Sequence, residues 1–320
     1  MSDTDTDTNL INPKLLLRIE EKMSCQSTMR PLPADVLQKL NKEIMLMHTY
    51  HSNAIEGNTL TLSETKLILD KGLTVGGKSL REHLEATNNA RAFELIEELA
   101  GQKAEIDHVT IQLIHEVVTK GIIDSSGQYR RKNVRIRGAI KTPPDWSKIV
   151  AMIDRLIADV KNSTTHPIET AAFLHHRLVE IHPFVDGNGR VARLLTNLYL
   201  IGNHYPVIIL KSEERKNYYQ CLKAADSGNL SPFANSLAKA VDESLSVYLS
   251  VYGGDDALVP LRIISETTPY SQEYLSLRAR QGVLDAVKIG KTWHTSQKAV
   301  RDYIVLHGKR DNEGTNLRIK

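Results

Sequence analysis

Residues 182–193 gather side chains that suit phosphate chemistry, reading His-Pro-Phe-Val-Asp-Gly-Asn-Gly-Arg-Val-Ala-Arg. The loop is rich in glycine and leads into an apolar helix predicted for residues 191–200. The open N–H groups and the dipole of a helix start favour an anion, and phosphate is the usual one. Gly187 and Gly189 let the backbone approach that anion closely. The segment therefore predicts a phosphate-binding turn.

Four charged or titratable side chains of the same segment add to this prediction. Arg190 and Arg193 lie three residues apart in the first helical turns, so both can face a polyphosphate with forked contacts. Asp186 offers a hard oxygen ligand that suits Mg²⁺. His182, with an ordinary pKa of ~6.5, can remove a proton near neutral pH. Gly-Asn-Gly alone is a common turn signal, but the full combination favours a phosphate site.

The segment resembles, at every motif position, the HPFxxGNGRxxR signature of the Fic family. These helical proteins mostly transfer AMP from ATP to a hydroxyl of a target protein. The resemblance covers roughly residues 40–250 and implies ATP, Mg²⁺ and a target protein with an acceptor Ser, Thr or Tyr hydroxyl. It implies that His182 is the general base and that Asp186 holds the Mg²⁺.

The same resemblance assigns the phosphate contacts. Asn188 and the amides of the loop around Gly187 and Gly189 would bind the α-phosphate. Arg190 and Arg193 would receive the β- and γ-phosphates. Some relatives use other nucleotide or phosphoryl donors, which the signature alone does not exclude.

A second segment, Ser52-Asn-Ala-Ile-Glu-Gly57, matches the [S/T]xxxE[G/N] pattern of the family's inhibitory helix. Ser52 and Glu56 lie four residues apart, on one face of a helix. The resemblance implies that Glu56 pairs with Arg193 and displaces the γ-phosphate, so that the enzyme is autoinhibited. Removal of AMP from a modified target is a variant of this activity. The alternative is an ordinary helix end, with Gly57 as the stop and Glu56 in solvent.

Two weaker features also fit the resemblance. Tyr218 and Tyr219 follow the signature at the distance where relatives place aromatic residues near the nucleotide, and we expect one of them to pack into the core instead. The alternating pattern of residues 129–138 predicts a strand or short hairpin. It would be the family's flap, which pairs with an extended target segment, although a surface hairpin without that role is equally consistent. The flap residues are Val134, Arg135, Ile136, Arg137 and Gly138.

Apolar residues at three- and four-residue spacings predict helices through most of the chain before residue 253. The fold class is therefore mainly α. The resemblance implies that the helices form a Fic-type core with a small β-hairpin flap, followed by a small C-terminal winged helix-turn-helix. The predicted helices cover residues 35–56, 63–71, 79–101, 107–121, 145–161, 167–181, 189–201, 213–225 and 232–251.

The predicted organisation has five parts. A disordered tail is followed by a helical region that contains the inhibitory helix, then by the Fic core, a linker and the C-terminal module. The linker holds a short strand-like run at 261–264. The parts are 1–12, 13–105, 106–252, 253–270 and 271–320.

Residues 271–320 resemble an excisionase-type winged helix-turn-helix. Two strands within 287–294 would turn at Gly290 to form the wing, and Trp293 would anchor the return strand. The segment holds ten basic and five acidic residues, and basic segments favour polyanions. The alternative function is therefore a DNA-binding regulator whose helical core senses a nucleotide. The same small fold also serves as a protein-binding or packing module.

Composition sets broad limits on the class of protein. The 320 residues, 41% hydrophobic and 25% charged, suit a globular protein of about two domains. No run approaches the ~20 apolar residues of a membrane span, and the first nine residues do not resemble a secretion signal. Two cysteines exclude a disulfide scaffold and a four-cysteine zinc site. We expect a cytoplasmic protein without a membrane partner, and the sequence leaves a homo-oligomer open.

Overall fold

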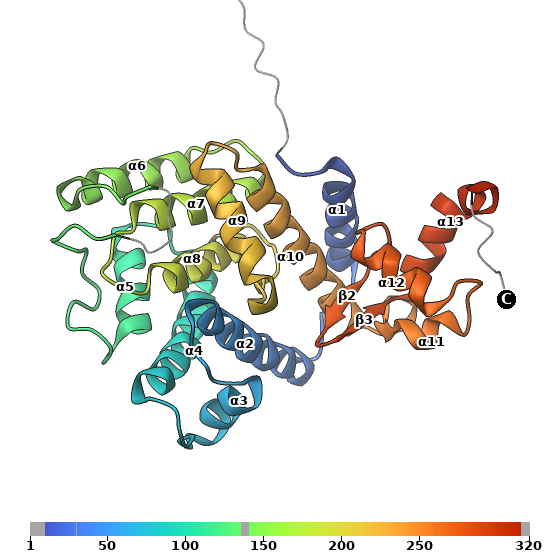
Figure 1. Ribbon diagram of the computed structural model, residues 1–320, viewed down its shortest axis with the longest axis horizontal. Coiled ribbons are helices and arrows are strands. Elements are labelled where there is room, and N and C mark those ends of the chain that lie inside the picture. Colours follow the sequence, from blue (N-terminus) through green and yellow to red (C-terminus); the bar gives the residue numbers. More distant parts are fainter. Residues whose placement is uncertain (1–9, 30, 136–140, 315–320) are drawn as a thin grey trace, which may run out of the picture. The chain divides into compact units, whose positions relative to one another are not determined.

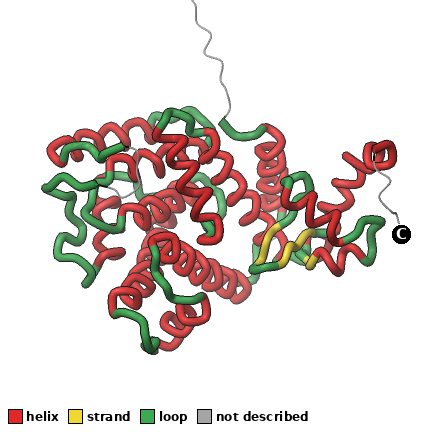
Figure 2. Tube along the Cα trace, in the orientation of Figure 1, coloured by secondary structure: helices red, strands yellow, loops and turns green. Residues whose placement is uncertain are grey.

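The computed structural model describes residues 10–29, 31–135 and 141–314, which are mainly helical (Figures 1 and 2). Helices lie in all the regions predicted to be helical. Short 3₁₀ turns at Trp146–Lys148 and Ser212–Glu214 lead into two of these helices. The helices before residue 253 are α1 (Pro13–Thr28), α2 (Ala34–Glu56), α3 (Leu62–Lys71), α4 (Leu80–Gly101), α5 (His108–Thr119), α6 (Ile149–Lys161), α7 (Pro167–Ile181), α8 (Asn188–Gly202), α9 (Arg215–Asp226) and α10 (Ser231–Ser250).

The chain divides into two compact units. The first comprises Met1–Leu17 and Pro33–Val241, and the second comprises Arg18–Leu32 and Asp242–Lys320. Helices α1 and α10 each contribute residues to both units. Among the described residues, none of the helices combines the length and the apolar character that a membrane-spanning helix requires.

Helix α8 forms the centre of the first unit and packs against α2, α4, α5 and α7 (Figure 1). Leucines and polar residues of this helix are both buried, including Leu194, Leu195 and Asn197. A helix that is buried on all sides is fixed by its neighbours rather than by its own propensity. The first turn of α8, where the signature lies, therefore has a rigid support.

Local signals explain where the helices of this unit begin and end. Thr61 and Ser79 each accept a hydrogen bond from the N–H three residues ahead, in capping boxes completed by Glu64 and Glu82. Helix α2 ends where Gly57 takes a left-handed conformation with φ +101°. Glu56 is thus the last residue of α2.

The strand predicted for residues 129–138 is wrong within the described part, because residues 129–135 form a loop. Arg130 holds this loop by donating side-chain hydrogen bonds to the carbonyls of Lys132 and Pro144. Asn133 accepts a hydrogen bond from the N–H of Trp146. Side chains, rather than a partner strand, therefore provide hydrogen bonds to the backbone groups of this loop and of the segment after it. Val134 and Arg135 lie in it, and Ile136, Arg137 and Gly138 lie outside the described residues.

The second unit holds a three-stranded antiparallel sheet in the order β1-β3-β2. The predicted hairpin is confirmed, with Gly290 at φ +60° between its strands. The strand-like run predicted at 261–264 is wrong, because these residues form a helix that buries Leu261 and Ile264, three residues apart. The elements are β1 (Val259–Pro260), α11 (Leu261–Ser265), α12 (Gln272–Arg280), β2 (Val287–Ile289), β3 (Thr292–Thr295) and α13 (Gln297–Gly314), after a 3₁₀ turn at Gly254–Asp256.

Trp293 packs against the small core of this unit, as predicted. Part of the basic charge counted in the sequence is neutralised within the unit. Arg301 Nη2 lies 2.6 Å from Asp255 Oδ2, and Lys298 Nζ lies 3.9 Å from Asp256 Oδ1. The net charge of the last 50 residues therefore overstates the positive charge available to a polyanion.

Lys22 is a buried cation in the second unit. Its Nζ donates to Asp242 Oδ1 at 2.6 Å, to Ser246 Oγ at 2.7 Å and to Asp285 Oδ1 at 2.9 Å. We expect Lys22→Ala to lower the free energy of unfolding by about 3 kcal/mol, because it leaves carboxylates without their buried partner. Urea unfolding measures the change, with exposed Lys14→Ala as the control. Equal stability of the two variants would contradict this role.

Candidate active site

The signature segment forms the connection between α7 and α8. Helix α7 ends at Ile181, and His182 takes a left-handed conformation with φ +50°. Gly187 has φ +79° and directly precedes Asn188, where α8 begins. A Cβ on Gly187 would lie 2.9 Å from the Cγ2 of Thr119, so both its conformation and its surroundings require glycine.

Asn188 fixes the shape of this loop. Its Oδ1 accepts a hydrogen bond from the N–H of Phe184, and its Nδ2 donates to the carbonyl of the same residue, both at 3.0 Å. The side chain that the sequence assigned to a phosphate is thus engaged with the loop. Within the described residues no side chain caps α8, which leaves the N–H groups of its first turn directed at the site.

His182 is half-buried and held on two sides. Its Nδ1 lies 3.3 Å from the carbonyl oxygen of Val179, a contact that assigns the ring hydrogen to Nδ1 and leaves Nε2 able to accept a proton. Arg130 donates from Nε to the His182 carbonyl at 2.8 Å. Burial lowers the pKa of His182, although the Val179 hydrogen bond partly opposes that effect. The ring is therefore neutral at neutral pH.

Asp186 lies at the opening of the loop, with its side chain 35% exposed. Its Oδ1 accepts from the N–H of Gly187 at 2.6 Å and lies 3.5 Å from Arg190 Nη2, while its Oδ2 accepts from Arg81. Burial raises the pKa of Asp186, but the Arg190 charge, the Gly187 N–H and Arg81 together bring it below its ordinary value. Asp186 is therefore an ionised carboxylate.

The two signature arginines have different surroundings. Arg190 is only 2% exposed, and its Nη1 lies 3.4 Å from Oε1 of Glu85 on α4. Its Nε and Nη1 have no hydrogen-bond partner among the described residues. Arg193 is also buried, but its guanidinium is engaged by the end of α2.

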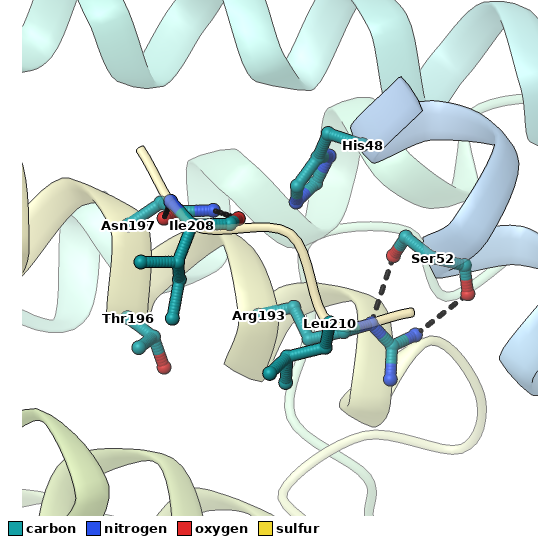
Figure 3. Close-up of a pocket in the computed structure, with 7 residues that line it drawn as sticks. All are labelled: His48, Ser52, Arg193, Thr196, Asn197, Ile208 and Leu210. Atoms are coloured by element: carbon teal, nitrogen blue, oxygen red, sulfur yellow. Dashed lines mark hydrogen bonds between the residues drawn. The ribbon is translucent and has the colours of Figure 1, made fainter. Parts of the chain in front are cut away.

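The structure brings Ser52, Glu56 and Arg193 together. Arg193 donates from Nε to Ser52 Oγ at 2.8 Å and from Nη2 to the Ser52 carbonyl at 2.9 Å (Figure 3). The Nη2 atom also donates to Glu56 Oε1 at 2.7 Å. A Cβ on Gly189 would clash with that carboxylate oxygen. The Glu56 carboxylate thus lies against the start of α8, the place where an anion is expected.

Arg193 and His48 of α2 are among the residues that line a small cavity (Figure 3). Its volume of about 10 Å³ gives room for roughly one water molecule, so it cannot hold a nucleotide. Burial first, and then the Arg193 charge, lower the pKa of His48 to about 3. His48 therefore adds no positive charge beside Arg193.

The structure separates the two candidate tyrosines. Tyr218 is buried, with its hydroxyl 2.8 Å from Nε2 of His175. Tyr219 is 42% exposed, and the Arg215 guanidinium lies 5.0 Å from the centre of its ring. Tyr218 is the core residue, and Tyr219 is the one that remains accessible. His175 is also buried, and its Nδ1 lies 3.0 Å from Oγ1 of Thr196.

Sequence reasoning missed several residues that shape the site, including Arg81, Glu85, Arg130 and His115. His115 accepts a hydrogen bond from the Gly127 N–H at Nδ1, so its Nε2 donates to the Asp186 carbonyl, 3.1 Å away. Its ring also stacks on Phe184, with ring centres 3.6 Å apart. No local pattern marks these residues, because each one acts on a loop far away in the sequence.

Comparison with known proteins identifies the family. Residues 105–200 match the model of the Fic/DOC family. A solved structure of a Fic domain containing signalling protein from Bacteroides thetaiotaomicron is 30% identical, with a TM-score of 0.68, over 73% of this chain and 97% of that chain. The chain belongs to the Fic/DOC family. A second Fic structure, Fic-1 residues 134–508 from C. elegans, is 31% identical with a TM-score of 0.68, over 75% of this chain and 72% of that one.

Fic proteins of Drosophila are also similar to this chain. The relative from Drosophila melanogaster named Protein adenylyltransferase Fic is 37% identical over 234 residues, which are 72% of this chain and 47% of that protein. The relative from Drosophila persimilis with the same name is 35% identical over 237 residues. This Fic chain thus spans about half the length of the curated relatives it matches.

Proposed function

We propose that this Fic protein is an autoinhibited protein adenylyltransferase. It transfers AMP from ATP to a Ser, Thr or Tyr hydroxyl of a target protein and releases pyrophosphate. One observation carries the proposal. A single loop has His182 at its first end and the uncapped N-terminus of α8 at its second end, so the base and the phosphate site belong to one turn. The Drosophila relatives named Protein adenylyltransferase Fic support the same activity.

The turn into α8 provides the triphosphate site. The N–H groups of its first turn offer a concentrated set of donors for the α-phosphate, without side chains in the way at Gly187 and Gly189. Arg190 and Arg193 supply two buried positive charges for the remaining phosphates, which the low dielectric of their surroundings strengthens. Tyr219 is the candidate for a nucleotide contact.

The transfer step uses His182 as a general base. Its Nε2 takes the proton of the acceptor hydroxyl while the hydroxyl oxygen forms a bond to the α-phosphorus. The bond from the α-phosphorus to the bridging oxygen breaks, and pyrophosphate leaves with that electron pair. The contact of Nδ1 with the Val179 carbonyl keeps the ring in this orientation, while the bond from Arg130 holds the backbone carbonyl of His182.

The residues present fit a Mg²⁺ ion that arrives with the nucleotide. Proteins usually hold Mg²⁺ through one or two carboxylates together with substrate phosphates, and Asp186 offers an ionised, part-exposed carboxylate beside the α8 start. In the described part of the chain there is no cluster of three or more His, Cys, Asp or Glu residues that could hold a metal alone. When bound, the ion would neutralise charge on the phosphates.

Glu56 provides the autoinhibition. Its carboxylate both occupies Arg193 and places negative charge next to Gly189, where the terminal phosphate would otherwise be held. ATP must then compete with Glu56 or bind in an unproductive pose. The same base and carboxylates can direct water at an AMP–protein bond, so removal of AMP is the second activity of this proposal.

Labelled ATP tests the proposal. The Glu56→Gly protein is incubated with ATP that carries its label on either the α- or the γ-phosphate. We expect protein-bound label only from the α-labelled nucleotide, because the AMP part is transferred. Label from γ-labelled ATP would indicate phosphoryl transfer instead and would contradict the proposed reaction.

The pH dependence of transfer follows from His182. Burial lowers the pKa of the folded His182, so its neutral, proton-accepting form persists below pH 6.5. We expect the acid limb of the pH profile of kcat/KM to have its midpoint below pH 6.5. Initial rates of transfer from pH 5 to pH 8 measure it, and a midpoint above 6.5 would contradict the assignment.

The second unit fits a winged helix-turn-helix, which we propose as its fold. The order of its elements places α11 and α12 between β1 and the β2–β3 hairpin, and that hairpin is the wing. Since Arg301 and Lys298 pair with acidic residues of the same unit, we do not propose DNA binding as its function.

A further inference from the structure

Arg81 forms a contact with Asp186 that the signature does not contain. It is the second residue of α4, and its Nη2 donates to Asp186 Oδ2 while its Nε donates to Glu85 Oε1 at 3.1 Å. The two interacting residues lie 105 positions apart in the chain. Arg81 therefore links the start of α4 to the carboxylate at the mouth of the site.

The start of a helix is an unfavourable place for a cation. The helix dipole favours acidic side chains in the first turn, and α4 has one in Glu82. The position of Arg81 is therefore explained by the carboxylates of Glu85 and Asp186 rather than by the stability of α4.

The two oxygens of Asp186 have different partners. Oδ1 accepts from the Gly187 N–H and lies near Arg190, both of which belong to the buried framework of the loop. Among the described residues, Oδ2 is bonded only by Arg81, whose side chain is 53% exposed. Oδ2 is thus the oxygen whose partner is itself exposed to solvent, so it is the one at which a ligand could replace that partner.

We propose that Arg81 and a divalent cation compete for Oδ2 of Asp186. In the nucleotide-free protein Arg81 neutralises this carboxylate, and a cation that arrives with ATP displaces the guanidinium. Arg81 therefore sets the concentration of divalent cation that the enzyme needs. The inference rests on the proposed function, because it takes Asp186 as the residue that would hold the metal.

The size of the effect follows from the exposure of the pair. An exposed ion pair stabilises a protein only weakly, so its loss changes the half-saturating cation concentration by about threefold to fivefold. Salt screens such pairs, so the difference between the variants decreases at high ionic strength. The contact of Arg81 Nε with Glu85 does not involve Asp186, so displacement from Oδ2 does not require its loss.

The experiment measures binding rather than turnover. The full chain with Glu56→Gly is mixed with an ATP analogue whose α–β bridge is methylene and cannot be cleaved, and Mn²⁺ is titrated. Isothermal titration calorimetry gives the half-saturating Mn²⁺ concentration. The variant is Arg81→Gln, and the matched control is Arg91→Gln, which removes the same charge from an exposed position on α4.

We expect Arg81→Gln to lower the half-saturating Mn²⁺ concentration about threefold to fivefold, while Arg91→Gln leaves it unchanged. An unchanged value in Arg81→Gln would overturn the inference. Weaker binding of the analogue at saturating Mn²⁺ without a change in the half-saturating value would also overturn it, because Arg81 would then hold phosphate instead. Asp186→Asn in the same Glu56→Gly background separates the two claims. If binding of the analogue depends equally on Mn²⁺ with and without the Asp186→Asn change, the proposed metal role of Asp186 itself fails.

Discussion

Glu56→Gly is expected to raise self-labelling from ATP by about tenfold to a hundredfold. The change removes a charge-assisted hydrogen bond to a buried arginine, and such bonds contribute roughly 1.5–3 kcal/mol. Since each 1.4 kcal/mol corresponds to about a factor of ten, the release of Arg193 has an effect of this size. Quantified transfer of α-labelled AMP onto the protein measures it.

Glu56→Gln is the matched control for this change. The glutamine side chain has the same size as that of Glu56, and its amide oxygen can still accept a hydrogen bond from Arg193. It differs in having no negative charge. We expect labelling between that of wild type and that of Glu56→Gly. If all three proteins label equally, the pair formed by Glu56 and Arg193 does not restrain the enzyme.

His182→Ala in the Glu56→Gly protein is expected to reduce transfer by about a hundredfold to ten-thousandfold, the usual range for removal of a general base. Nucleotide binding should persist, because the N–H groups of α8 and the two arginines remain. Single-turnover labelling measures the transfer step, and calorimetry with the methylene analogue measures binding.

The control for His182 is His204. It also has a left-handed backbone, with φ +68° compared with +50° at His182, but its side chain is exposed at the other end of α8. We expect the Glu56→Gly protein with His204→Ala to be labelled as strongly as the Glu56→Gly protein itself. Full activity of the His182→Ala protein would exclude His182 as the base.

The sequence predicts the site best where the functional residues are close together in the chain. The signature segment places His182, Asp186 and the start of α8 on one loop, so their proximity follows from the chain itself. The pairing of Glu56 with Arg193 is different, since 137 positions separate the two residues. Only the family resemblance connects them, and the structure brings them into contact.

The errors arise where local patterns are ambiguous. The alternation around Val134 is typical of a strand, but side chains of Arg130 and Asn133 hold the described part of that segment as a loop. A short apolar run such as 261–264 fits a strand or a buried helix equally well, and burial of Leu261 with Ile264 selects the helix.

The residues that sequence reasoning missed could not be predicted for one physical reason. Arg81, Arg130 and His115 hold the signature loop through side chains that come from α4, from the loop after α5 and from α5. Their local sequence resembles ordinary helix and loop positions. Their roles exist only because the packing around α8 brings distant segments to one turn.

Intact-mass spectrometry of the Glu56→Gly protein, incubated with Mg²⁺ and each of the four nucleoside triphosphates in turn, shows whether the chain transfers a nucleotide and which one. If the turn into α8 holds a triphosphate while His182 activates a hydroxyl, ATP should add the mass of one AMP group or more to the chain. No added mass with any of the four nucleotides, together with no thermal stabilisation by ATP, would exclude both the triphosphate site at α8 and the role of His182.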